Sequence, residues 1–216
     1  MTWHLKGRQA VASLDPATRY RITRSQVMAQ CANKPLLWVL EELTRVFVVG
    51  GLSGPLHKVE HFLCLITRLL QICPSPDIVL VMLRQELHKY VKVAALFVIR
   101  LIGNDIIVQE AVKLGLNDYR KIRVYGSDET PAMSFVTTGT KRPRDTDDDG
   151  GDFPVEKQKD ESDAIENLEP PHYFVLRMDE LTERLFQLNQ PRDVLRSKSI
   201  FLGVPLPGFV DLPHIL

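Results

Sequence analysis

Between residues 36 and 116 the chain holds a succession of apolar runs bounded by helix start and stop signals. Residues 36–49 (LLWVLEELTRVFVV) follow Pro35 and stop at Gly50, and a proline at the start with a glycine at the end is typical of a helix. Residues 59–73 (VEHFLCLITRLLQIC) form a longer, largely apolar run before Pro74, which predicts a helix at the centre of the fold.

Two more helices are predicted downstream. Ser75 is placed to cap the first of them, with Pro76 in its first turn and IVLVMLRQEL after it. Residues 89–102 (KYVKVAALFVIRLI) contain a strand-like stretch, but their length favours a buried helix. We expect the two cations of this run, Lys92 and Arg100, to reach outward into solvent.

A further helix is predicted from the residues that flank it. Gly103 ends the preceding run, and Asn104 caps the segment IIVQEAVKLGL. Several helices in succession, joined by short turns, predict an all-α fold: a compact multi-helix domain with orthogonal or bundle-like packing.

Two short segments instead alternate polar and apolar residues, as half-buried strands do. They are residues 121–125 (KIRVY) and residues 173–178 (YFVLRM). Because they flank residues 128–172, we interpret them as one small β-hairpin that carries a long insertion. The insertion is rich in charge and poor in large apolar side chains, which predicts disorder.

The C-terminal part of the chain combines one more helix with a proline-rich end. Asp179 is placed to cap a helix that runs through Asn189, and a further turn is expected at Pro191. The final segment, GVPLPGFVDLPHIL, is predicted to have little regular structure, with enough apolar groups to lie against a surface.

The charge of the chain is unevenly distributed. The 27 basic and 27 acidic residues sum to zero. Residues 128–172 hold 13 acidic and 5 basic residues, a net of −8, so the rest holds 27 − 13 = 14 acidic and 27 − 5 = 22 basic residues, a net of +8. The chain is therefore predicted to be a basic helical body with an acidic insertion.

Composition excludes several classes of protein. With 216 residues and 44% hydrophobic residues, the chain is neither fibrous, a mini-protein nor disordered throughout. Its three cysteines, Cys31, Cys64 and Cys73, form no CxxC pair and favour a reducing compartment. No signal peptide or membrane-spanning run is found, so we expect a soluble intracellular protein.

One string resembles a catalytic motif. His57, Glu60 and His61 fit the pattern H-x-x-E-H, in which two histidines bind zinc and the glutamate acts as a base. On a helix the two histidines would share a face, with Cys64 beneath them as a third ligand. Alternatively, the string is an exposed helix start with two ordinary histidines, because Gly54 and the proline after it place His57 in a turn. The sequence holds no P-loop and no G-x-S-x-G elbow.

Basic clusters suggest two other roles. A nuclear localisation signal is predicted within the insertion, and a chance basic cluster is the alternative; its residues are Lys141, Arg142, Pro143 and Arg144. Two further groups could contact RNA phosphates without reading sequence: Arg19, Arg21 and Arg24, and Lys113, Arg120, Lys121 and Arg123. Acidic protein partners are equally compatible with these two groups.

The order and spacing of four strings resemble the pre-mRNA-splicing factor 38 family. The strings are FVVGG at 47–51, FLCL at 62–65, KYV at 89–91 with Arg100 after it, and LNDYRKI at 116–122. The resemblance spans about residues 19–125 and resumes from 174 to about 202, and NDYRKI is its most specific element. Within this family the residues before FLCL form a turn and are not metal ligands.

This resemblance implies a non-enzymatic spliceosome scaffold without cofactors, located in the nucleus. Such a scaffold joins the precatalytic spliceosome with the tri-snRNP and is needed for its activation. The implied partners are an elongated helical splicing factor and a zinc-finger splicing factor, bound by a monomer inside a large ribonucleoprotein complex. Residues 1–18 would form an N-terminal extension, and residues 19–216 one helical domain interrupted at 128–172.

Candidate partner-binding residues follow from the family strings. They are Phe62, Leu65, Asn117, Asp118, Tyr119, Arg120 and Lys121. An alternative for NDYRKI is a helix end, with Asn117 as the cap and Asp118 paired locally with Arg120. Two departures from the family are the much longer hairpin loop and the lack of an Arg/Ser-rich tail. A zinc hydrolase and a helical adaptor outside splicing remain the alternative functions.

Overall fold

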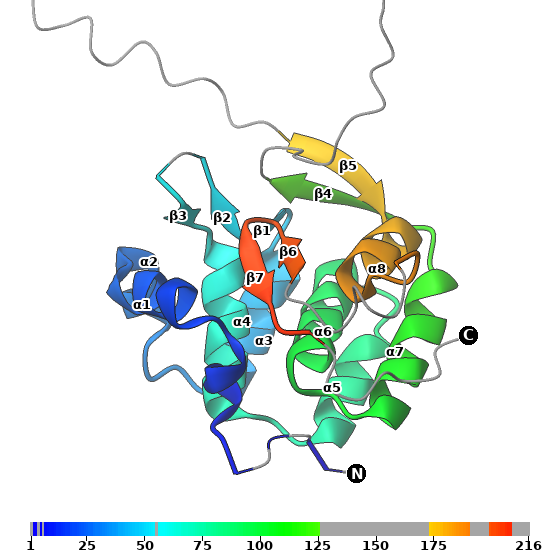
Figure 1. Ribbon diagram of the computed structural model, residues 1–216, viewed down its shortest axis with the longest axis horizontal. Helices are drawn as coiled ribbons and strands as arrows, with labels where there is room; N and C mark the ends of the chain where they lie inside the picture. Colours follow the sequence, from blue (N-terminus) through cyan, green and yellow to red (C-terminus); the bar gives the residue numbers. More distant parts are fainter. Residues whose placement is uncertain are drawn as a thin grey trace, which may run out of the picture. The chain divides into compact units, whose positions relative to one another are not determined.

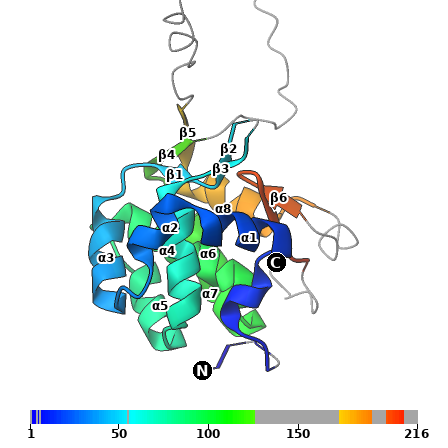
Figure 2. The same ribbon diagram turned by 90° about the vertical axis from the view of Figure 1, so that its left-hand side faces the viewer.

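Helices form most of the structure, and small strands gather at one end of them (Figures 1 and 2). The computed structural model describes residues 2–3, 5, 7–54, 56–125, 173–190 and 199–208. The elements in chain order are η1 (Ala10–Ser13), α1 (Pro16–Arg24), α2 (Gln26–Cys31), α3 (Leu36–Arg45), β1 (Val49–Gly50), β2 (Leu52–Ser53), β3 (Lys58–Val59), α4 (His61–Ile72), α5 (Pro76–Leu83), α6 (Lys89–Ile102), α7 (Asp105–Leu116), β4 (Lys121–Tyr125), β5 (Tyr173–Arg177), α8 (Met178–Phe186), β6 (Ser199–Phe201) and β7 (Val204–Leu206).

The central helix is α6, which has the bounds predicted from the sequence. Every residue from Val91 to Ile102 is buried, because α3, α4, α5, α7 and α8 all pack against this helix. Burial of each large aliphatic side chain stabilises the fold by about 1.5–3 kcal/mol, so the apolar run supplies much of the core. The Phe97 ring of α6 packs edge-on against Phe62 of α4, with ring centroids 5.5 Å apart.

The predicted helix starts around α6 are largely confirmed. The Asn104 side chain accepts a hydrogen bond from the Ile107 backbone N–H at 3.0 Å and so caps α7. Helix α5 begins at Pro76 as predicted, although the Ser75 side chain makes no capping hydrogen bond. This helix ends at Leu83, earlier than the apolar pattern indicated, because the chain then turns toward α6.

Two predicted helices are too long at the ends that face each other. Helix α3 stops at Arg45, and helix α4 starts only at His61. Between them the chain is extended: Val49 and Gly50 pair in parallel with Val124 and Tyr125 of β4. The β-branched residues of this stretch suit a strand, and the helical prediction failed because their pairing partner lies far along the sequence.

The predicted β-hairpin is confirmed and belongs to a larger sheet. Strands β4 and β5 pair antiparallel, from Lys121 opposite Arg177 to Tyr125 opposite Tyr173. The strand order is β1-β4-β5. Strand β1 pairs only with the end of β4. At the other end of β4, Lys89 Nζ of α6 donates to the Lys121 carbonyl at 2.6 Å.

Helix α8 starts one residue before the predicted cap. Arg177 occupies the N-cap position. Its backbone N–H donates a hydrogen bond to the Glu180 carboxylate at 2.9 Å. Asp179 therefore lies in the first helical turn, where an acid interacts favourably with the helix dipole. The helix ends at Phe186, and Gln187 adopts a left-handed conformation with φ 54°.

Two further two-stranded sheets were not predicted. Strands β2 and β3 pair antiparallel, and so do β6 and β7; of these, β7 lies in the final segment that we expected to be irregular. The two hairpins are joined by a hydrogen bond of 2.9 Å from the Leu52 N–H to the Leu202 carbonyl. A side chain at Gly51 would collide with that carbonyl, so the close approach requires glycine.

The prediction that Arg100 reaches solvent is wrong. Its side chain is buried, with Nε donating to the Leu185 carbonyl at 3.0 Å and Nη2 to the Pro207 carbonyl at 2.7 Å. Burial lowers the pKa of Arg100 to about 10, which leaves the guanidinium charged at neutral pH. It thereby fastens α8 and the segment after β7 to the central helix.

The N-terminal residues pack as part of the same core. Leu14 is buried before α1, and Asp15 caps that helix by accepting a hydrogen bond from the Ala17 N–H at 3.1 Å. The boundary predicted between residues 18 and 19 falls inside α1. The chain divides into two units, residues 1–127 with 171–216 and residues 128–170, and the described residues belong to the first.

Several predictions lie outside the described residues. These are the insertion at 128–172 up to the start of β5, the nuclear-targeting candidates at 141–144 and the turn at Pro191. Among the helices that are described, none has both the length and the apolar character needed to cross a membrane.

Candidate partner-binding site

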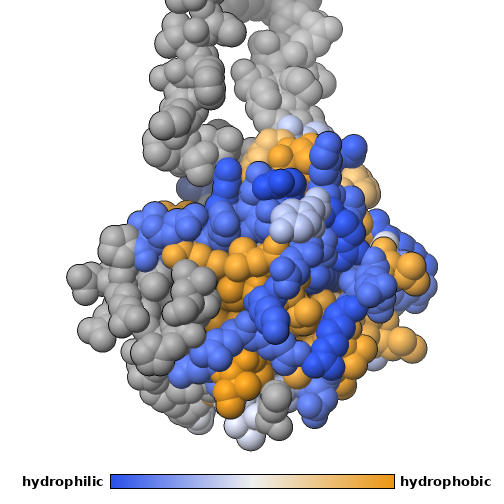
Figure 3. All heavy atoms as spheres, turned by 90° about the vertical axis from the view of Figure 1, so that its right-hand side faces the viewer, coloured by the Kyte–Doolittle hydropathy of each residue, from blue (hydrophilic) through white to orange (hydrophobic). Residues whose placement is uncertain are grey.

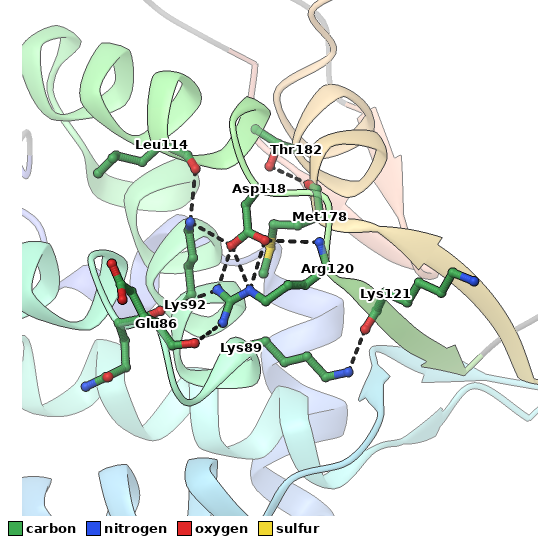
Figure 4. A network of polar contacts seen from close by, with 10 residues as sticks. Glu86, Lys89, Lys92, Leu114, Asp118, Arg120, Lys121, Met178 and Thr182 are labelled. Carbon is green, nitrogen blue, oxygen red and sulfur yellow. Dashed lines mark hydrogen bonds and ion pairs between the residues drawn. The ribbon is translucent and has the colours of Figure 1, made fainter.

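The NDYRKI residues lie where α7 ends, and they meet α6 and the turn after α5 (Figure 4). Three charged side chains meet there, Asp118, Lys92 and Arg120, which we call the Asp118 network. Asp118 is only 9% exposed, and Lys92 is 8% exposed. The prediction that Lys92 reaches solvent is therefore wrong, because its ammonium group has an internal partner.

Asp118 accepts hydrogen bonds from both cations. Lys92 Nζ donates to Oδ2 at 2.8 Å, and Arg120 Nη2 donates to the same oxygen at 2.5 Å. The Arg120 Nε and backbone N–H donate to Oδ1 at 2.9 and 3.1 Å. Charge-assisted bonds of this kind are stronger than neutral ones, and together they offset the cost of burying the charges.

The network also satisfies backbone groups at element ends. Lys92 Nζ donates to the Leu114 carbonyl at 2.9 Å, one of the carbonyls that the end of α7 leaves without a helical partner. Arg120 Nη1 donates to the Glu86 carbonyl in the turn after α5. The site therefore ties α7, α6 and that turn together through charged side chains.

Backbone hydrogen bonds connect the same residues to α8. The Met178 N–H donates to the Arg120 carbonyl, and the Asp179 N–H donates to the Asp118 carbonyl, both at 3.0 Å. Because β4 begins directly after Arg120, the Asp118 network fixes both the hairpin and α8 relative to the helical core.

The environment changes the proton affinity of two groups. Burial acts to raise the pKa of Asp118, but hydrogen bonds from Arg120 and Lys92 outweigh it and hold that pKa well below its usual range. The hydrogen bond to Asp118 raises the pKa of Arg120. Asp118 and Arg120 are consequently both ionised throughout the physiological range.

An open pocket of about 490 Å³ lies beside the network. Its walls are the end of α5, the turn at residues 84–86 and residues 117–120. Tyr119 lines the pocket and is 65% exposed. Arg84 on the rim pairs with Glu110 of α7 at 2.5 Å. The pocket thus combines a fixed polar floor with one exposed aromatic side chain.

The structure places the partner-binding candidates in different environments. Asn117, Tyr119 and Lys121 are exposed and available to a partner. Asp118 and Arg120 are bonded to each other and Asn117 occupies the C-cap of α7, as the helix-end alternative predicted. Phe62 and Leu65 of α4 are buried in the core, where no partner could reach them without unfolding the helix.

The arrangement of the H-x-x-E-H string differs from that of a helical zinc site. His57 lies in the turn between β2 and β3 with φ 48°, so it shares no helical face with His61. The Glu60 carboxylate accepts a hydrogen bond from Ser53 Oγ at 2.5 Å. Within the described residues, no three His, Cys, Asp or Glu side chains are grouped so as to hold a metal ion.

Cys64 is also poorly suited to metal binding. Its thiol lies in the core, 3.7 Å from Ser25 Oγ. Burial raises the pKa of Cys64 to about 11, whereas metal ligation requires the thiolate. Cys31 is likewise buried with a raised pKa.

Sequence reasoning missed Lys92 as a member of the site. The residue stands 26 positions before Asp118, so no local pattern connects the two. One signal was available: a lysine inside an otherwise apolar helix is rarely buried unless it is paired, and the acid of NDYRKI was a candidate partner.

The fold and the site define a class of protein: a helical domain whose buried charges lock its elements together beside an open surface pocket. A model of the PRP38 family matches residues 4–141. The chain belongs to the PRP38 family.

Curated relatives carry related names. The chain is 34% identical over 107 residues to pre-mRNA-splicing factor 38 of Arabidopsis thaliana, covering 50% of this chain and 30% of the relative. It is 32% identical over 100 residues to pre-mRNA-splicing factor 38 of Schizosaccharomyces pombe, covering 46% and 47%. The matches thus span less than half of the relatives' length. The nuclear location predicted from the sequence agrees with these names, since pre-mRNA splicing takes place in the nucleus.

A solved structure shares the fold. A chain in the crystal structure of the Snu23-Prp38-MFAP1(217–258) complex of Chaetomium thermophilum aligns with a TM-score of 0.63 and 22% sequence identity. The alignment covers 95% of this chain and 81% of that one. This likeness supports the mainly helical architecture with small strands.

Proposed function

We propose that the protein is a non-enzymatic scaffold of the spliceosome that acts in pre-mRNA splicing by docking segments of partner proteins. Membership of the PRP38 family carries this proposal, together with relatives that are named as pre-mRNA splicing factors. As the family resemblance implies, the protein would join the precatalytic spliceosome with the tri-snRNP and be needed for its activation.

The pocket beside the Asp118 network is the proposed docking position. Its floor is held by charged bonds and therefore costs little ordering entropy when a partner binds. Tyr119 offers a large, rigid contact surface, and tyrosine is enriched among the residues that contribute most to binding. On the side of the molecule drawn in Figure 3, apolar areas lie between polar residues.

We propose two partners by analogy with the solved complex. That complex contains Snu23 and a segment of MFAP1. Counterparts of these two proteins would correspond to the zinc-finger and the elongated helical splicing factor that the family resemblance implied. The binding mode we expect is a helical or extended segment laid across the helical surface.

Purification of the tagged protein, with co-purified proteins and RNAs identified together, tests the scaffold role. We expect splicing proteins and small nuclear RNAs to be recovered. The variant Tyr119→Ala should reduce recovery of one partner about 30-fold or more, which is typical of an interface hot spot. Its own stability should change by less than about 0.5 kcal/mol, because the side chain is exposed.

Tyr20→Ala is the matched control. Tyr20 is the same residue type, is 57% exposed and lies on α1 outside the site. Its replacement should leave partner recovery unchanged. Recovery of no splicing protein or small nuclear RNA would contradict the scaffold role and favour a helical adaptor outside splicing.

A further inference from the structure

The outward face of the β4–β5 hairpin is basic and aromatic. Alternate residues of the two strands point to this face, and all six are non-acidic: Lys121, Arg123, Tyr125, Tyr173, Val175 and Arg177. The opposite face carries Ile122 and Val124, which are buried. The surface is therefore one side of a sheet that the core holds in place.

The positions of the cations on this face reduce the stability of the strand pair. Lys121 lies directly opposite Arg177, and like charges opposite each other destabilise a strand pair. Arg177 is partly neutralised by Asp179 at 3.0 Å and Glu180 at 3.4 Å. Over the part of the chain described by the structure, Lys121 and Arg123 form no ion pair. Two cations on one strand, about 7 Å apart, are thus available to an anionic ligand.

Two tyrosines extend the face toward the far end of the hairpin. The Tyr125 and Tyr173 rings are 5.4 Å apart between centroids, and Tyr173 is 48% exposed. The Arg123 guanidinium lies 5.8 Å from the centre of the Tyr173 ring. An aromatic platform thus stands next to a cation that is free to contact a phosphate.

We propose that this face binds single-stranded RNA, with phosphates on Lys121 and Arg123 and a base stacked on Tyr173. Single-stranded nucleic acids are bound in this way, by cations that follow the backbone and aromatic rings that stack on bases. An acidic protein segment would use the cations but not the tyrosine platform, so the combination favours RNA. This inference goes beyond the scaffold role and does not depend on it.

Binding of a fluorescein-labelled oligouridine of about 12 nucleotides to the purified full chain, measured by fluorescence anisotropy, tests the proposal. We expect Tyr173→Leu to raise Kd about 5-fold or more, because stacking on the ring is lost. Tyr173→Phe keeps the ring and should bind within 2-fold of the natural chain, roughly the scatter expected for a retained stack.

A double replacement tests the phosphate contacts. Lys121→Gln with Arg123→Gln should reduce the slope of log affinity against log salt concentration by about 1.4, or about 0.7 for each contact. The control is Lys34→Gln with Arg8→Gln, which removes the same charge from exposed positions outside the hairpin and outside both basic groups, and which should leave the slope unchanged.

Several outcomes would overturn the proposal. These are no oligouridine binding, equal losses in the hairpin double variant and in the Lys34/Arg8 control variant, or a Tyr173→Leu variant that binds as the natural chain does. Equal binding of oligouridine annealed to oligoadenosine would exclude base stacking. Equally efficient competition by polyglutamate would assign the face to an acidic protein. The scaffold role is tested separately, by partner recovery with the Tyr119→Ala variant. A negative result for RNA binding therefore does not bear on the scaffold role.

Discussion

Asp118 is the residue on which the candidate site depends. It is nearly buried and accepts hydrogen bonds from Lys92 and Arg120, and its backbone carbonyl accepts one from Asp179. Removing one member of a buried charge pair leaves the other uncompensated, which costs more than the pair itself contributes. The carboxylate therefore has a structural role, and the adjacent exposed Tyr119 is the better candidate for partner contact.

Replacement of the carboxylate should be costly. Asp118→Asn is expected to lower the free energy of unfolding by about 2–3 kcal/mol, because the buried ammonium of Lys92 loses its counter-charge. Urea denaturation followed by circular dichroism measures this loss. Glu41→Gln is the control, since its ion pair with Arg45 is exposed and should contribute less than about 0.5 kcal/mol. Equal effects of the two changes would contradict the structural role.

The same residue predicts a dependence of stability on pH. The folded-state pKa of Asp118 lies below its unfolded value, so its contribution is fully present above about pH 4 and is lost as the pH falls below it. The difference in unfolding free energy between the natural chain and Asp118→Asn should therefore shrink from pH 5 toward pH 3. A difference that stays constant over that range would show that the carboxylate is not linked to folding.

At the scale of single residues, sequence patterns predicted where the site lies but not all of the contacts that form it. NDYRKI was singled out, and the pairing of Asp118 with Arg120 was anticipated because the two are neighbours on one turn. Lys92 and Arg100 were expected at the surface, because their partners are 26 and as many as 107 residues away. Helical periodicity reports which positions are polar but cannot report a distant group that satisfies them.

At the scale of elements, the Arg100 side chain connects α6 to α8 and to the C-terminal segment by hydrogen bonds. Arg100→Met should lower the free energy of unfolding by about 2–4 kcal/mol, because the Leu185 and Pro207 carbonyls lose their donor. We also expect faster amide exchange in β6 and β7, measured by mass spectrometry. Arg21→Met on the surface of α1 is the control. Equally slow exchange in β6 and β7 in both variants would show that Arg100 does not hold this segment in place.

Elements with local signals were predicted well, and those with distant partners were not. Helix α6 and the β4–β5 pairing have sequence patterns of their own, a long apolar run and strict alternation. Strand β1 was assigned to a helix, because its parallel partner β4 lies more than 70 residues away along the chain. The pairs β2–β3 and β6–β7 are too short to show periodicity and depend on contacts with each other through Leu52 and Leu202.

At the scale of the whole molecule, the insertion is predicted to be separable from folding. Replacing residues 128–170 by a short Gly-containing turn should leave the free energy of unfolding unchanged or raise it by up to about 2 kcal/mol, since a shorter loop is easier to close. Nuclear import of a fluorescent fusion should fall, because residues 141–144 are removed. A large loss of thermal stability would show that the insertion contributes to the core.

Arg100 also determines when the domain can be completed during synthesis. The carbonyl of Pro207 that it binds is translated 107 residues later, which is roughly 5–20 s after Arg100 itself at ordinary rates of chain elongation. Until then the Arg100 Nη2 group lacks the Pro207 carbonyl that it binds in the folded domain. The contacts around Arg100 are therefore complete only after the last strands have been synthesised.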